Sequence, residues 1–194
     1  MISGIVLAAG GSTRLGRPKQ TLPLDGLPLL SHVLRAAAAS SLDEVVLVLG
    51  HKADSIARLA GEWGQRTVVN ADFASGQSSS VSCGLDAIDP AAEAALFLIG
   101  DQPDVGHEVI DAVIQAYHAS GGTIVQPVYR GVPGNPVLFR SDLFPELLRV
   151  HGDAGGRSVV RAHAADVVAV PVSDRSIPRD VDTEEDYAAL VDTW

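Results

Sequence analysis

Cysteine is almost missing from this chain, because Cys83 is its single copy among 194 residues. One cysteine excludes a disulfide within the chain and a thiolate-rich metal site, and it favours a reducing compartment, for which we expect the cytoplasm. The six histidines show no close ligand spacing, so no structural zinc is expected. No apolar run reaches the ~18 residues that span a bilayer, and the first residues lack a secretory signal pattern. We therefore expect neither secretion nor membrane spanning.

Positive charge is also scarce. Fourteen Lys and Arg residues face 24 Asp and Glu residues, which gives a formal net charge of -10. Binding to nucleic acid or to a membrane surface needs a basic face, so neither is expected. An anionic ligand would have to be held by a local group of cations.

Such a group stands at the start of the chain, where an apolar strand breaks into the glycine-rich loop of residues 4–19, GIVLAAGGSTRLGRPK. Gly10, Gly11 and Gly16 permit positive φ and carry no Cβ, so successive N–H groups could turn toward one anion. This composition predicts a loop that binds a polyphosphate.

Three cations surround these glycines, namely Arg14, Arg17 and Lys19, and arginine can grip phosphate oxygens with two parallel donors. The loop is not a P-loop, because Arg17 and Pro18 follow the last glycine where Lys and Ser or Thr would be needed, and it has no GxGxxG spacing. Pro18 disfavours a helix at this point, so the loop is expected to run extended toward Lys19.

Alternating strand and helix patterns with short connections predict an α/β fold with a mainly parallel sheet covered on both faces. We expect one domain over residues 1–194. The family resemblance described below implies that residues 1–104 mainly bind a nucleotide and residues 105–194 mainly bind the acceptor of the transferred group. The predicted strands cover residues 2–9, 44–49, 67–70, 94–99, 123–129, 137–140 and 166–170. The predicted helices cover residues 29–40, 53–63, 78–88, 107–120 and 184–191, with two short helices between residues 140 and 166.

Ligands of such sheets lie at the carboxyl ends of the strands, and polar residues follow several of them here. Asp101 comes directly after the strand 94–99, where its carboxylate could hold a Mg²⁺ ion that bridges to phosphate oxygens. Asp101 could instead only open a turn before Pro103. Its combination with the first loop favours the metal.

A second acidic residue, Asp182, precedes the last predicted helix. Either Asp182 or Thr183 could cap that helix, and Asp182 could also be a second Mg²⁺ ligand. Both interpretations remain open from the sequence.

Three further loops offer ligand contacts at the same edge. In residues 70–81, Gly76 could let a planar base approach the backbone, and the serines could bond base edges or cap the helix. The loops 130–136 and 151–157 are candidates for an acceptor pocket, although they could be only a hairpin turn and a helix connection. Cys83 is expected to be a small buried residue of a helix.

Five segments together resemble one family. They are LAAGGSTRLGRPK, GDQP, GVPGNPVLF, GDAGGR and DVDTEEDY, in this order, and they resemble the molybdenum cofactor cytidylyltransferases of the MocA type within the MobA-like nucleotidyltransferases. The resemblance spans nearly the whole chain. It implies a Rossmann-like three-layer nucleotidyltransferase fold and a Mg²⁺-dependent enzyme, with Mn²⁺ able to substitute, that transfers CMP from CTP to the phosphate of molybdopterin or its molybdenum form.

The resemblance also implies roles for individual residues. Arg14, Lys19 and Asp101 would be catalytic, with Asp101 and Asp182 on the metal. The nucleotide would be bound by Leu7, Ala8, Ala9, Gly10, Gly11, Ser12, Arg14, Lys19, Gly76, Ser80 and Asp101, and the acceptor by Asn135, Asp153 and Arg157. One departure concerns the acceptor side, since many MocA-type sequences have His where Asn135 stands.

Several other functions remain open. A sister enzyme would use GTP or another phosphorylated acceptor, a carrier would bind molybdopterin without consuming CTP, and an interaction module would have lost the site. A molybdenum hydroxylase apoenzyme or its maturation factor is the further partner that the family implies.

Overall fold

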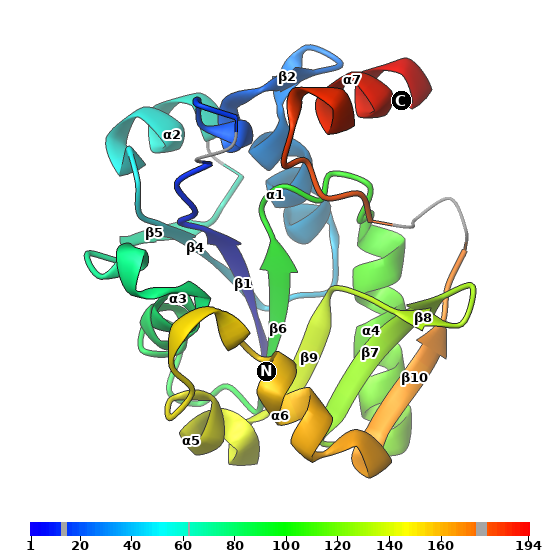
Figure 1. The fold of residues 1–194 in the computed structure, drawn as a ribbon. Helices are drawn as coiled ribbons and strands as arrows, with labels where there is room; N and C mark the ends of the chain where they lie inside the picture. Colours follow the sequence, from blue (N-terminus) through cyan, green and yellow to red (C-terminus); the bar gives the residue numbers. More distant parts are fainter. Residues whose placement is uncertain (13–14, 62, 174–177) are drawn as a thin grey trace.

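A twisted, mainly parallel sheet forms the middle layer of the computed structural model, which describes residues 1–194 except 13–14, 62 and 174–177 (Figure 1). Its strands follow the order β10-β7-β9-β6-β1-β4-β5, with β8 paired to β7. β9 runs antiparallel to both of its neighbours, and β8 runs antiparallel to β7. The strands are β1 (Ile2–Ala8), β4 (Glu44–Leu49), β5 (Arg66–Val69), β6 (Ala94–Ile99), β7 (Ile124–Tyr129), β8 (Val132–Pro133), β9 (Val137–Arg140) and β10 (Val167–Pro171).

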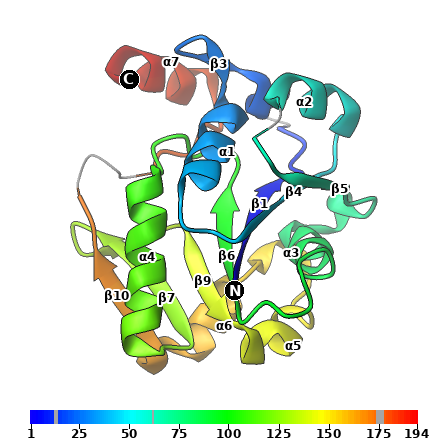
Figure 2. The same cartoon turned by 180° about the vertical axis from the view of Figure 1, so that it is seen from behind.

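Helices cover both faces of this sheet, which makes the three layers that the sequence predicts. α1, α2 and α4 cover one face (Figure 2), and α3, α5 and α6 cover the other (Figure 1). Their bounds, with those of α7 and of a small separate hairpin, are α1 (Leu29–Ala39), α2 (Ala53–Ala60), α3 (Gln77–Leu85), α4 (His107–Ser120), α5 (Phe144–Leu147), α6 (Arg157–Ala162), α7 (Glu184–Thr193), β2 (Pro23–Leu24) and β3 (Leu27–Pro28). Short 3-10 turns lie at η1 (Lys19–Thr21), η2 (Phe73–Ser75), η3 (Ser141–Leu143), η4 (Gly152–Ala154) and η5 (Ala164–Asp166).

The central strands are apolar on both faces, because successive side chains of a strand point to opposite sides. In β6, Leu96 and Leu98 join the core under α1 and α4, whereas Phe97 joins the core under α3 and α5. All of these side chains are buried. Burial on both faces explains why β4 and β6 appear in the sequence as continuous apolar runs.

A third apolar cluster attaches the C-terminal segment to the first loop. Leu15, Leu22 and Leu24 pack with Val181 and Leu190, and all five are buried. Figure 1 accordingly shows α7 beside β2, above the carboxyl ends of the parallel strands. This packing brings residues near position 180 next to residues near position 20.

The predicted elements differ from the structure mainly at their ends. The helix predicted over 53–63 ends at Ala60, where Gly61 follows with a φ of +79°, and the helix predicted over 78–88 spans Gln77–Leu85. Among the described residues, no helix combines the length and the apolar character needed to cross a bilayer.

Candidate active site

The loop after β1 turns through two residues with left-handed backbone conformation. Among the described residues of this loop, Gly16 uses the positive φ that its glycines permit, at +67°. The other left-handed residue is Ser12, with a φ of +49°. Its hydroxyl accepts a hydrogen bond from the Lys19 backbone N–H at 3.1 Å, and this bond holds the two ends of the loop together.

A buried glutamine supports the same loop from below. The Gln20 side-chain amide donates to the carbonyl oxygens of Ala8 at 3.1 Å and of Gly10 at 3.3 Å. Both carbonyls are thereby turned inward. Sequence reasoning missed Gln20, although it directly follows the predicted Lys19.

Lys19 joins the two carboxylates that the sequence places far apart. Its ammonium contacts Asp101 Oδ2 and lies 2.8 Å from Asp182 Oδ1. The Lys19 and Asp101 side chains are only 17% and 8% exposed. Among the described residues, the other oxygen of Asp101, Oδ1, is buried without a hydrogen-bond partner. The predicted metal-binding carboxylates therefore lie around one cation, with one oxygen still uncommitted.

The surroundings perturb both members of this ion pair. Burial raises the pKa of Asp101, and the contact with Lys19 offsets only part of this effect. Burial would lower the pKa of Lys19, but Asp101 and Asp182 together raise it above its usual value. Lys19 therefore keeps its charge at neutral pH.

The remaining cations of the loop have different positions. Arg17 is exposed and forms an ion pair with Glu184 of α7 at 2.9 Å, and its guanidinium lies over the Tyr187 ring at 6.0 Å from the centroid. Arg14, the other predicted catalytic cation, lies outside the described residues.

A cavity of about 350 Å³, called the smaller cavity below, opens beside the loop. Its lining contains most of the residues predicted to bind the nucleotide. They are Leu7, Ala8, Ala9, Gly10, Gly11, Lys19, Gly76, Ser80 and Asp101, and Gln20 and Asp153 also contribute. Ser12 turns its hydroxyl into the loop instead. The buried Ser80 hydroxyl accepts a hydrogen bond from Asn70 at 3.1 Å.

Gly76 has a packing role that the sequence analysis did not identify. Its φ is +112°, and an added Cβ would lie 2.5 Å from the carbonyl oxygen of Gly152. The neighbouring Ser78 hydroxyl donates to the same oxygen at 2.6 Å. The start of α3 thus packs directly on the turn η4, so the loop predicted to contact the base supports a loop predicted to contact the acceptor.

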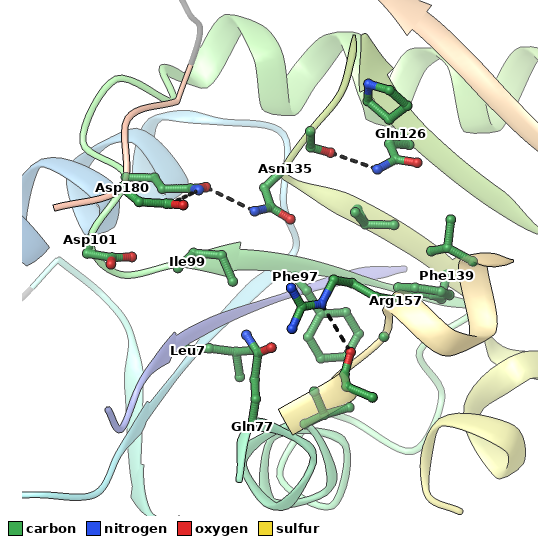
Figure 3. A pocket seen from close by; sticks show the side chains of 18 of the residues that line it. Leu7, Gln77, Phe97, Ile99, Asp101, Gln126, Asn135, Phe139, Arg157 and Asp180 are labelled. Carbon is green, nitrogen blue, oxygen red and sulfur yellow. Dashed lines mark hydrogen bonds between the residues drawn. The ribbon is translucent and has the colours of Figure 1, made fainter. Parts of the chain in front are cut away.

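A larger cavity of about 720 Å³ lies on the other side of Asp101 (Figure 3). Its wall includes Phe97 and Phe139, whose rings meet edge to face at 5.8 Å between centroids. Asn135 and Arg157, both predicted to bind the acceptor, line it, whereas Asp153 lines the smaller cavity. The Arg157 guanidinium also donates to the carbonyl oxygens of its own loop, the shorter contact being 2.8 Å to Asp153.

The two cavities share one wall. Five residues line both, namely Leu7, Lys19, Gln77, Ile99 and Asp101. Leu7 and Ile99 are paired in neighbouring strands, so the shared wall marks the carboxyl ends of β1 and β6. Two ligands bound side by side would therefore meet at the Lys19–Asp101 pair.

Several amide side chains in this region were not singled out by the sequence analysis. Gln77, Gln102 and Gln126 all line the larger cavity, together with Asp180. Gln102 belongs to the GDQP segment and Asp180 to the acidic segment before α7, so both lay next to predicted residues. Gln126 lies inside a strand and had no such neighbour.

The fold and the site together have the architecture of a nucleotide-binding transferase. The sheet is mainly parallel, a glycine loop follows its first strand, and a lysine–carboxylate pair lies between two cavities. The sequence profile of the MobA-like NTP transferase domain matches residues 4–167, and the chain belongs to this family.

Individual relatives extend over almost the whole chain. Nicotine blue oxidoreductase of Paenarthrobacter nicotinovorans is 32% identical, over 98% of this chain and 96% of its own. The molybdenum cofactor cytidylyltransferase of Escherichia coli is 24% identical, over 96% and 93%. Rv0371c of Mycobacterium tuberculosis, solved in complex with manganese, superposes with a TM-score of 0.84 at 31% identity, over 100% of this chain and 99% of its own.

Proposed function

We propose that this protein transfers CMP from CTP to the terminal phosphate of molybdopterin or its molybdenum form, giving a cytosine dinucleotide and pyrophosphate. The observation that carries the proposal is the wall shared by the two cavities, with Lys19 and Asp101 in it. A group transfer between two bound substrates needs both in contact at a charged centre, and this wall provides one.

The donor side follows from the glycine loop. CTP would bind in the smaller cavity, with its triphosphate along residues 8–12 and its base toward Gly76 and Ser80. Lys19 would neutralise charge on the α-phosphate region, and Arg14 would hold the departing pyrophosphate. An oxygen of the acceptor phosphate forms a bond to the α-phosphorus, while the bond from that phosphorus to the oxygen of the β-phosphate breaks. No covalent enzyme intermediate is needed.

The residues present fit a divalent metal ion. Asp101 and Asp182 would hold Mg²⁺, because they offer hard oxygen ligands and because Asp101 Oδ1 is buried without a partner among the described residues. Mg²⁺ takes only one or two protein carboxylates when phosphates supply other ligands. The bound ion would neutralise charge on the phosphates. Mn²⁺ would substitute, in line with the manganese complex of Rv0371c.

The choice of nucleotide and acceptor rests on one relative and on the lining of the larger cavity. The printed name of the Escherichia coli relative favours CTP and the molybdenum cofactor. The lining of the larger cavity by two aromatic rings and several amides suits a flat polar heterocycle. A molybdenum hydroxylase apoenzyme or its maturation factor would be the recipient of the product, and the cytoplasm its location.

One experiment tests this function. The pure protein is incubated with molybdopterin or its molybdenum form, with Mg²⁺ and with each nucleoside triphosphate separately, and the products are identified by mass. We expect a cytosine dinucleotide and pyrophosphate with CTP. A guanine dinucleotide would assign the protein to the sister activity, and tight cofactor binding without consumption of any triphosphate would make it a carrier.

A further inference from the structure

One wall of the larger cavity consists of amide side chains connected in a fixed order. Asp180 accepts a hydrogen bond from Gln102 Nε2 at 2.6 Å. Gln102 Oε1 in turn accepts from Asn135 Nδ2 at 3.2 Å (Figure 3). Gln102 is buried, whereas its partner Asp180 is exposed.

The chemistry of the partners determines which end of each amide is which. A carboxylate only accepts hydrogen bonds, so the end of Gln102 at Asp180 must be its NH₂ group. The opposite end is then an oxygen, so Asn135 must turn its own NH₂ group toward it. Asn135 Oδ1 is left without a partner among the described residues, and Figure 3 shows it on the cavity side of the side chain.

A separate contact determines which end of the Gln126 amide is its oxygen. Its Nε2 donates to the carbonyl oxygen of Gly134 at 3.1 Å, and a carbonyl oxygen can only accept. Within the described part of the chain, no group bonds Gln126 Oε1. Gly134 directly precedes Asn135, so the two amides belong to one wall, which offers their two oxygens as acceptors and engages one N–H of each NH₂ group.

We propose that the side-chain oxygens of Asn135 and Gln126 recognise the hydrogen-bond donor edge of a flat heterocycle. Such an edge consists of a ring N–H beside an exocyclic amino group. Gln102 and Asp180 are positioning residues, because their hydrogen bonds turn the oxygen of Asn135 toward the cavity. An aminopyrimidinone ring presents such an edge. The buried residues Phe97 and Phe139 line the same cavity and supply an apolar surface for the rest of the heterocycle.

This inference deepens the proposed function and rests on it for the identity of the heterocycle as a pterin. The binding wall and the transfer reaction can nevertheless be tested apart. A wrong ring edge would leave buried polar groups unpaired, so discrimination between two rings of equal shape should be large.

The test compares two pteridines that differ in one group. Pterin carries the 2-amino group, and lumazine has a carbonyl oxygen in its place. Both are titrated into the wild-type protein by calorimetry, without nucleotide. We expect pterin to bind roughly tenfold more tightly or better, because the lumazine oxygen would face acceptor oxygens. Equal affinities, or a preference for lumazine, would overturn the proposal.

Variants identify the residues that read the edge. Gln126→Leu and Asn135→Leu should each reduce the pterin preference, while Gln115→Leu on the exposed face of α4 should leave it unchanged. Asp180→Asn removes the acceptor-only partner, so Gln102 can turn either way and the ratio of pterin to lumazine affinity should fall. If Asp180 has only a structural role, Asp180→Asn should lower the affinities for pterin and lumazine by the same factor. That result would show that Asp180 does not contribute to the selectivity.

Two further outcomes separate this inference from the function. Guanosine carries the same donor edge on a purine, and tighter binding of guanosine than of pterin would overturn the assignment to a pterin. If the protein prefers pterin but transfers no nucleotide, the proposed recognition by Asn135 and Gln126 would be supported and the proposed transferase activity would be refuted. If the protein transfers nucleotide to an acceptor without this edge and binds the two pteridines equally, the proposed recognition by Asn135 and Gln126 would be refuted and the transferase activity would stand.

Discussion

Replacing Lys19 by methionine removes the charge at the centre of the site while keeping a side chain of similar length. The ammonium contacts Asp101 and lies 2.8 Å from Asp182. If Lys19 stabilises charge that develops during transfer, its loss should lower kcat by on the order of 100-fold or more, which corresponds to about 3 kcal/mol.

The same substitution should affect stability by a smaller amount. At 2.8 Å and an effective dielectric constant of about 20, the gross attraction of Lys19 to Asp182 is about 6 kcal/mol. Desolvation and the 39% exposure of Asp182 cancel most of this, so we expect a net loss of about 2 kcal/mol. For a chain of this length, such a loss lowers Tm by roughly 4–8 °C.

Metal affinity is the most discriminating measurement, because Lys19→Met should raise it while lowering kcat and Tm. Lys19→Met leaves Asp101 and Asp182 without their shared cation, so Mn²⁺ should bind more tightly in the absence of nucleotide, as measured by calorimetry. Lys52→Met, at an exposed position, is the matched control and should change neither metal affinity nor pyrophosphate release. Unchanged turnover in Lys19→Met would exclude Lys19 from the mechanism, and weaker metal binding would contradict the arrangement of carboxylates around it.

Three further predictions concern other parts of the chain. Gly76→Ala should destabilise the protein by about 3 kcal/mol and weaken CTP binding, because its Cβ would meet Gly152; an unchanged Tm in thermal unfolding would contradict this. Burial raises the pKa of Cys83, so iodoacetamide at pH 8 should label the folded protein more slowly than the unfolded chain, and Cys83→Ser should retain turnover; complete loss of activity would restore a chemical role for the thiol. Pairing with Glu146 raises the pKa of His163 above 6.5, so the pair stabilises the fold below about pH 6.5 and loses this effect as pH rises through the raised pKa. The difference in Tm between the wild type and Glu146→Gln should therefore become smaller as pH rises. A difference that grows with pH would refute the pairing.

Much of the fold could be predicted from apolar patterning. β4, β6, α4 and β9 have the predicted bounds, because short buried runs and an uninterrupted amphipathic helix are local signals. Helix ends were less accurate. α2 stops at Ala60 because Gly61 adopts a φ of +79°, a conformation that the composition of the segment does not dictate.

The site was predictable where a residue type has one dominant chemistry. Asp101, Lys19 and the glycine loop lie together as their charges and spacing suggest. The glutamines were not predictable, since an amide both donates and accepts, and Asn135 was named through the family resemblance alone. Their roles depend on partners far away in sequence, such as Asp180 for Gln102, 78 positions later.

One reversed strand explains how both substrates could reach the same edge of the sheet. In a purely parallel sheet, every strand contributes the loop that follows its carboxyl end. β9 runs antiparallel to β6 and β7, so it is the residues before its start, including Asn135, that lie at the edge where β1 and β6 end. The loop after β1 then faces the smaller cavity, the loop before β9 faces the larger cavity, and Asp101 after β6 lies between them. The antiparallel insertion is therefore what places two cavities side by side at this edge of the sheet.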